Sequence, residues 1–188
     1  NVKINETYKE TPSLNGISIK NISDNDLQIQ NVTVDSSNFV VEGPSTQPTV
    51  SAGATNTDYK IRAKEGLPVG TYTATITVTD SNGNYTATVT LKVEPKQLTG
   101  LGVSGLDSTW VYGTTKTPTA TGVDDLTPDD YEITYSKKGD SENYGNIGNN
   151  LPTLVGKYKA TLSVKNPNYT ASEASVNFEI TPITIEVK

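Results

Sequence analysis

Four aspartates lie close together in the second half of the chain, and they are the side chains best suited to bind a cation. Carboxylates at this spacing repel one another unless a cation or solvent reduces the repulsion. A solvated acidic loop explains the same sequence and is the interpretation that we favour, so no metal site is assigned. The four candidates are Asp124, Asp125, Asp129 and Asp130.

A second candidate for cation binding is the segment Asp80-Ser-Asn-Gly-Asn84. It is similar to the start of a calcium loop, which places oxygen ligands at alternate positions and requires glycine at its sixth position. The sixth residue here is Tyr85. Asn82-Gly83 tolerates positive φ, so a hairpin turn accounts for the whole segment.

Aromatic and amide side chains of the second half could form a carbohydrate site. Aromatic faces stack on the C–H surfaces of sugars, and amides hydrogen-bond to hydroxyl groups. Tyr144, Asn146 and Asn149 lie in a Gly- and Asn-rich stretch, residues 137–152, which we expect to be irregular and exposed. Trp110 either extends this platform or anchors the core of its domain. We favour the core for Trp110.

Several residue types that carry enzyme chemistry are missing. The 188 residues include no Cys, no His and no Met. Thiol nucleophiles, disulfides, thiolate metal sites and imidazole bases are therefore excluded. A carboxylate pair could hydrolyse glycosides, but no two acids occupy opposed, inward-facing positions that the sequence identifies. We expect no catalysis and no cofactor.

The charge pattern argues against a nucleic-acid partner. The formal net charge is -6, and Arg62 is the sole arginine. Nucleic-acid recognition depends on clustered Arg and Lys, so we expect no nucleic-acid partner. No apolar run approaches the ~18 residues that a membrane helix needs, so we expect no membrane span in this fragment. The chain begins at Asn1, inside a strand-like segment, and we interpret it as part of a longer protein.

A repeat of nearly 90 residues organises the chain. Gly70-Thr-Tyr-Thr-Ala-Thr-Ile-Thr-Val78 recurs as Gly156-Lys-Tyr-Lys-Ala-Thr-Leu-Ser-Val164, an offset of 86 residues at the glycines. The offset is 84 at the Asn-Tyr-Thr that follows each copy, and 87 at the proline that closes it. Such a period sets the size and number of domains. The sequence therefore predicts two domains of one kind.

The polar alternation within each copy predicts strands. Tyr72, Ala74, Ile76 and Val78 alternate with threonines, the pattern of a strand with one buried face. Residues 85–93 return antiparallel after the turn. In residues 27–34 the apolar phase changes around Asn31, which predicts a β-bulge. Seven strand segments in the first repeat favour an all-β fold of two tandem antiparallel immunoglobulin-like β-sandwich domains.

We place the domains at residues 1–95 and 96–182. The boundary, Glu94-Pro-Lys-Gln97, is short and contains a proline, so we expect a stiff, end-to-end arrangement. Residues 183–188 begin Ile-Thr-Ile-Glu-Val, which follows Pro182 as Gln97-Leu-Thr99 follows Pro95. They read as a linker, as the start of a further module, or as a strand borrowed by the second domain.

Short Gly, Tyr and Pro motifs resemble those of bacterial surface proteins. The motifs are Leu27-x-Ile-x-Asn31, Asn38-Phe39, Ala52-Gly53 and Leu67-Pro-Val-Gly-Thr-Tyr72 in the first half, and Val111-Tyr-Gly-Thr-Thr115, Leu154-Val-Gly-Lys-Tyr158, Asn168-Tyr169 and Phe178-Glu-Ile-Thr-Pro182 in the second. The first half resembles bacterial immunoglobulin-like domains found in tandem on envelope proteins. The second half resembles MBG/YDG-type repeats, without their Asp between Tyr112 and Gly113. The resemblance implies an extracellular segment on a bacterial surface, with no catalytic residues.

These observations favour a stalk or spacer in adhesion, whose partners are neighbouring modules of the same chain. An adhesin module that binds a host or cell-wall glycan or protein through residues 137–152 is an alternative. A third alternative is an accessory domain of a secreted glycoside hydrolase. An exposed uncharged aromatic strip would favour binding, whereas a uniformly polar surface would favour a spacer.

Overall fold

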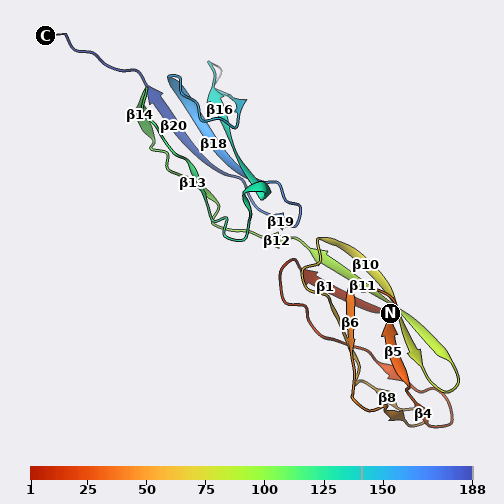
Figure 1. The fold of residues 1–188 in the computed structure, drawn as a ribbon. Helices are drawn as coiled ribbons and strands as arrows, with labels where there is room; N and C mark the ends of the chain where they lie inside the picture. The colour runs from red at the N-terminus through yellow and green to blue at the C-terminus, as the bar shows by residue number, and fades with distance from the viewer. Residues whose placement is uncertain (141, 188) are drawn as a thin grey trace. The chain divides into compact units, whose positions relative to one another are not determined.

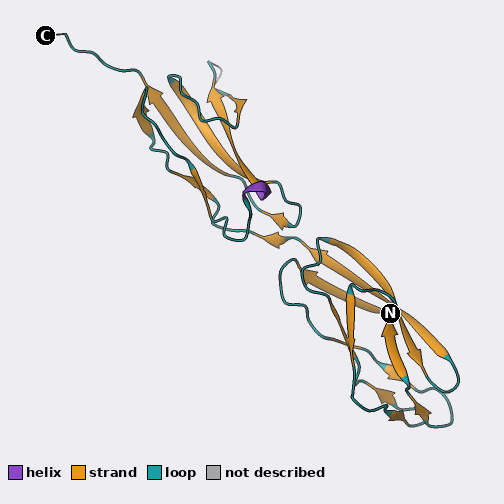
Figure 2. Cartoon of the chain, viewed as in Figure 1, coloured by secondary structure: helices purple, strands orange, loops and turns teal. Residues whose placement is uncertain are grey.

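The computed structural model describes residues 1–140 and 142–187, which form two compact units, Asn1–Lys96 and Gln97–Lys188. Among these described residues, the two units consist of strands and loops apart from one 3-10 turn, η1 (Pro128–Asp130), as Figure 2 shows. This confirms the predicted all-β fold. Within the described ranges, no helix is long and apolar enough to span a bilayer.

The first unit is a sandwich of two sheets (Figure 1). One sheet has the order β1-β11-β10-β5 and the facing sheet has the order β2-β9-β6, with two short ladders, β3-β8 and β4-β7, beyond them. The strands are β1 (Val2–Thr7), β2 (Asn15–Gly16), β3 (Ile19–Lys20), β4 (Leu27–Gln28), β5 (Asn31–Val34), β6 (Phe39–Glu42), β7 (Thr49–Val50), β8 (Thr55–Asn56), β9 (Lys60–Ala63), β10 (Gly70–Thr79) and β11 (Asn84–Glu94).

The core of this unit lies between the two sheets, as the alternation predicts. Ala74 and Ile76 of β10 are buried against Val89 and Leu91 of β11, while the intervening threonines face outward. β10 and β11 pair antiparallel over ten residue pairs, from Gly70↔Val93 to Thr79↔Asn84. Period-2 burial of this kind fixes the register, because a slip of one residue would turn every apolar side chain to solvent.

The predicted bulge around Asn31 is wrong. The chain leaves β4, which pairs with β7, and enters β5, which pairs with β10. Between these strands the backbone N–H of Ile29 donates to Pro48 O and that of Gln30 donates to Thr79 O. The change of apolar phase therefore marks a crossing from one ladder to another, where the buried side is the opposite one.

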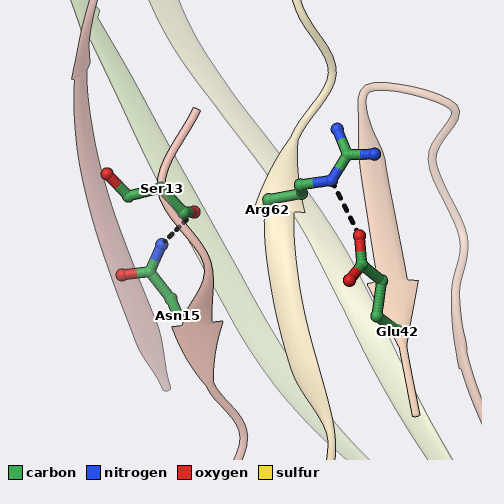
Figure 3. Close-up of polar contacts among 4 residues, drawn as sticks. All are labelled: Ser13, Asn15, Glu42 and Arg62. Carbon is green, nitrogen blue, oxygen red and sulfur yellow. Dashed lines mark hydrogen bonds and ion pairs between the residues drawn. The ribbon is translucent and has the colours of Figure 1, made fainter. Parts of the chain in front are cut away.

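The outer face of the second sheet carries the sole arginine of the chain. Arg62 of β9 donates from Nε to Glu42 Oε1 of β6 at 2.9 Å, a diagonal cross-strand pair. Figure 3 shows this pair beside Asn15, whose Nδ2 donates to the carbonyl of Ser13. Both charged side chains are partly exposed, so the pair contributes ~1 kcal/mol or less to stability.

The second unit has one large sheet and one small one (Figure 1). The large sheet has the order β14-β20-β18-β16-β17, and a two-stranded ladder joins β13 to β15. A further short ladder joins β12 to β19. The strands are β12 (Lys96–Gln97), β13 (Gly102–Ser104), β14 (Thr109–Val111), β15 (Thr119–Thr121), β16 (Tyr131–Lys138), β17 (Tyr144–Gly148), β18 (Gly156–Val164), β19 (Tyr169–Thr170) and β20 (Ala174–Thr181).

Aromatic rings fill the core of the second unit. Phe178 stacks on Trp110 at a centroid distance of 4.8 Å and on Tyr158 at 5.4 Å, and it meets Tyr135 edge-on at 6.3 Å. Burial raises the pKa of the Tyr135 and Tyr158 phenols, because a phenolate loses its hydration in this cluster. The volume of these rings fills the space over the large sheet that the two-stranded β13–β15 ladder leaves uncovered.

The stretch 137–152, predicted to be irregular, contains strand structure. β16 continues to Lys138, and β17 returns antiparallel to it, with a register shift between Tyr135 and Ser136. β17 is a short edge strand with a tight turn at each end, and Gly and Asn suit these turns. Their presence therefore does not mean that the segment is irregular. Gly148, at the end of β17, has φ +99°.

Residues 182–187 form no strand in the structure. The prediction that the second domain borrows this segment as a strand is therefore wrong for the described residues. Its apolar side chains, Ile183, Ile185 and Val187, are exposed.

The same tyrosine corner begins the main hairpin of each unit. The Tyr72 hydroxyl donates to Pro68 O, and the Tyr158 hydroxyl donates to Leu154 O, both at 2.8 Å and both across four residues. Each ring folds back over the glycine two positions earlier. A Cβ at Gly156, whose φ is +154°, would lie 3.2 Å from the Tyr158 hydroxyl oxygen. The repeated Gly-x-Tyr therefore encodes this corner.

We expect Tyr158→Phe to lower the unfolding free energy of the second unit by about 1 kcal/mol, because it removes one hydrogen bond and keeps the ring. Trp110 is the sole tryptophan, so its fluorescence in a urea titration reports this unit. Tyr72→Phe is the matched control and leaves the Trp110 transition unchanged. Equal shifts in both variants, or none in Tyr158→Phe, would contradict the role of the corner.

Candidate functional site

Trp110 does not belong to an exposed aromatic platform. It is 7 % exposed, and its ring stacks on Phe178 in the core. Its place on β14, beside Ile180 of β20, directs the side chain inward. The core interpretation is therefore correct for Trp110, and the carbohydrate hypothesis loses this residue because a buried face cannot stack on a sugar.

Tyr144 and Asn146 share one face of the edge strand β17, since they are two residues apart. Tyr144 is half-buried, and Lys159 Nζ of β18 lies 5.3 Å from the centroid of its ring. A cation over the ring is attracted by its π-face. One side of the ring is therefore covered by an ammonium group, and this narrows the surface left for stacking on a sugar.

The two asparagines make local contacts. Asn146 Oδ1 accepts a hydrogen bond from Gly148 N at 2.7 Å, which holds the turn after β17. Asn149 lies beyond the strand, and its Nδ2 is 3.5 Å from Glu132 Oε2. The structure thus brings Tyr144 and Asn146 together, places Asn149 at the next turn, and separates Trp110 from all three.

The structure does not gather the four aspartates around one point. Among the described residues, no group of three or more His, Cys, Asp or Glu side chains could hold an ion. Asp130 Oδ2 accepts hydrogen bonds from the N–H and the hydroxyl of Thr127 at 2.8 Å, and its Oδ1 accepts one from Asn166 Nδ2 at 2.7 Å. Asp130 thereby joins two loops, and Asp124, Asp125 and Asp129 are exposed.

The segment after β10 is a hairpin turn, as its sequence indicates. Asp80 is buried, and its Oδ1 accepts hydrogen bonds from the N–H groups of Asn82 at 2.6 Å and Gly83 at 2.8 Å. The Asp80 N–H donates to Gly83 O, which closes the turn. An Asx turn of this kind accounts for both residue types without an ion.

Sequence reasoning missed an apolar groove of about 290 Å³ in the first unit. Its walls are residues 17–23 with Leu27 on one side, and the outer end of the β10–β11 hairpin on the other. Ile22 and Tyr85 at this groove are exposed, at 90 % and 54 %. Isoleucines at 17, 19 and 22 do not fit one strand face, and this irregularity was the available signal.

We expect Asp130→Ala to destabilise the second unit by about 1–2 kcal/mol, because the cap of η1 and the bond to Asn166 are lost together. Asp124→Ala, at an exposed position of the same cluster, changes the stability by less than about 0.5 kcal/mol. Urea denaturation followed by Trp110 fluorescence measures both. If calcium raised the unfolding midpoint of the unsubstituted protein, the structural role of the cluster would be wrong.

No family model and no curated protein sequence matches the chain, whereas several solved structures are similar to it. A crystal structure of protocadherin gamma C5 EC1-3 is similar, at 12% identity and a TM-score of 0.43. The alignment covers 97% of this chain and 65% of the protocadherin chain. The titin I-band fragment I67-I69 aligns with 98% of this chain and 63% of its own, at 14% identity and a TM-score of 0.32.

A structure of the Vibrio cholerae VesB protease aligns with 50% of this chain, at 16% identity and a TM-score of 0.36. The chain spans 30% of that protein. In the structure of this chain, the paired sheets, the alternating burial and the tyrosine corners identify two tandem immunoglobulin-like β-sandwich domains.

Proposed function

We propose that the chain is a non-catalytic spacer of a bacterial cell-surface protein, located outside the cell, where it transmits tension between neighbouring modules. The observation that carries this proposal is the parallel pairing of an early strand with the last strand in each unit. β1 pairs with β11 over six residue pairs, and β14 pairs with β20 over three. The resemblance of both halves to repeats of bacterial surface proteins supports the location.

Parallel terminal strands resist pulling for a geometric reason. Tension that enters through β1 and leaves through β11 acts along both strands in opposite directions. The ladder of hydrogen bonds between them is then loaded in shear, so many bonds must break together. An antiparallel pair pulled from one end would instead open one bond at a time. Each unit also has its own core, so one can extend while the other stays folded.

The two units have ladders of different length. In the second unit, three pairs join β14 to β20, from Thr109↔Glu179 to Val111↔Thr181. In the first unit, the six pairs run from Val2↔Val89 to Thr7↔Glu94. A longer shear ladder requires more bonds to break in one step, so the first unit is the stronger element under load.

Pulling on the two ends of the chain in a single-molecule experiment will therefore give two unfolding events, with the second unit opening at the lower force. Lys3→Pro removes a backbone donor in the middle of β1, and we expect it to lower the higher of the two forces. Thr46→Pro, in the exposed loop between β6 and β7 of the same unit, is the matched control for a proline substitution and should leave this force unchanged. If the first unit opened first, or if Lys3→Pro left its force unchanged, the shear mechanism would fail.

A second candidate function is binding of a glycan at β17. Tyr144 and Asn146 on one strand face, with Lys159 beside the ring, combine an aromatic face with polar groups. This combination is the kind that orients a sugar. The same edge strand would also accept an extended peptide from a protein partner.

A glycan array with the full chain tests this candidate. If β17 binds a glycan, we expect a saturable signal that Tyr144→Ala reduces about tenfold or more. Tyr112→Ala, at an exposed tyrosine of the second unit outside β17, should leave the signal unchanged. No signal on any glycan, or equal loss in both variants, would remove the candidate and leave the spacer proposal intact.

A further inference from the structure

The groove of the first unit is apolar and open. Ile17, Ile19, Leu27, Ile76 and Val78 contribute to its lining, and its volume is about 290 Å³. Tyr85, Thr86 and Ala87 form one wall at the outer end of the hairpin. Exposed apolar surface of this kind is a common mark of an interaction site.

The last described residues carry a second exposed apolar feature. Ile183, Ile185 and Val187 are 59 %, 80 % and 93 % exposed, and they alternate with Thr184 and Glu186. Alternation with period two is the pattern of a strand with one buried face. Residues 183–187, which we call the tail, therefore have the sequence of a half-buried strand, but they lie in no ladder.

The linker between the two units shows how a segment of this kind packs on a β-sandwich. The residues after Pro95 are the counterpart of the tail by their position after a proline, with Leu98 at the place of Ile185. Leu98 is 8 % exposed, in contrast to Ile185. Its backbone N–H donates to Thr170 O of the second unit at 2.8 Å. The segment after the proline thus covers the end of the β18–β20 hairpin at which the chain turns.

The surface that residues 97–101 line in the second unit corresponds to a wall of the open groove. These residues line one cavity together with Ser172, Glu173 and Ala174. In the paired strands of the two main hairpins, the first strands correspond with an offset of 86 and the returning strands with an offset of 87, as in Tyr72↔Leu91 and Tyr158↔Phe178. Ala174 therefore corresponds to Ala87, and the Asn-Tyr-Thr motif matches Tyr85 and Thr86 with Tyr169 and Thr170, whose carbonyl accepts the hydrogen bond from Leu98. The surface that is covered in the second unit is the one that is open in the first.

We propose that the tail of one copy of this chain binds in the groove of the first unit of another copy. The tail takes the place that residues 96–98 hold against the second unit, and it buries Ile183 and Ile185 against Tyr85 and the isoleucines of the groove. The charges agree, because Lys20 is the sole charged residue in the lining and Glu186 the sole charge in the tail. The contact is heterologous, so it extends copies head to tail instead of closing a symmetric dimer.

Analytical ultracentrifugation of the full chain tests the contact. We expect the mean mass to rise over about a hundredfold range of protein concentration. Ile185→Asp in the tail and Tyr85→Ser in the groove each weaken the association about tenfold or more, because each places a polar group in the apolar contact. Both positions are exposed in the single chain, so the variants keep their fold. Ile147→Ser, at an exposed isoleucine of β17, is the matched control and associates normally.

A mixture of the two variants tests the direction of the contact. The Ile185→Asp chain keeps an intact groove and the Tyr85→Ser chain keeps an intact tail, so the mixture forms one heterodimer and no larger species. A synthetic peptide of residues 181–188 also shifts the NMR signals of Tyr85 and Ala87 in the Ile185→Asp chain. A wild-type chain that stays monomeric and a peptide that leaves these signals unchanged would overturn the proposal, as would equal weakening by Ile147→Ser. The inference does not depend on the spacer role, which pulling experiments test on single chains.

Discussion

The bond from a tyrosine hydroxyl to the carbonyl four residues earlier is the constraint on which each unit depends. It fixes the point at which the chain enters β10 and β18, the strands at the centre of both main sheets. Once this entry is fixed, Tyr72 and Tyr158 lie opposite Leu91 and Phe178, and the register of the hairpin follows. The returning strands then provide the ladder for β1 and β14, so the corner also determines the parallel pairing of these early strands with the last strand of each unit.

The two units solve the same packing problem with different side chains. In the first, aliphatic residues of two substantial sheets fill the core. In the second, the β13–β15 ladder is too small to cover the large sheet, and stacked rings of Trp110, Phe178 and Tyr158 supply the missing volume. A core can change its composition in this way while its backbone contacts persist, since packing requires volume and shape more than residue identity.

A repeat also creates complementary surfaces at its two ends. Residues 97–101 lie against the hairpin end of the second unit, whereas the corresponding wall in the first unit is open and the tail is exposed. In an array of such domains, the groove of one domain would be covered by the tail of the domain before it. The proposed contact would account for the strongly exposed isoleucines at positions 22, 183 and 185.

The sequence alone determined the fold class, the repeat and the main hairpin, because alternation, turn residues and Gly-x-Tyr act locally and impose the same structure wherever they occur. Tertiary structure decided the rest. Trp110 has a sequence context compatible with core or surface, and its stacking on Phe178, far along the chain, settles the matter. The bond from Asn166 to Asp130 joins two loops that are distant in the sequence, and the phase change at Asn31 marks a crossing between ladders. The groove beside Tyr85 lies between segments about 60 residues apart, and the irregular spacing of the isoleucines in residues 17–22 does not reveal which distant segment they meet.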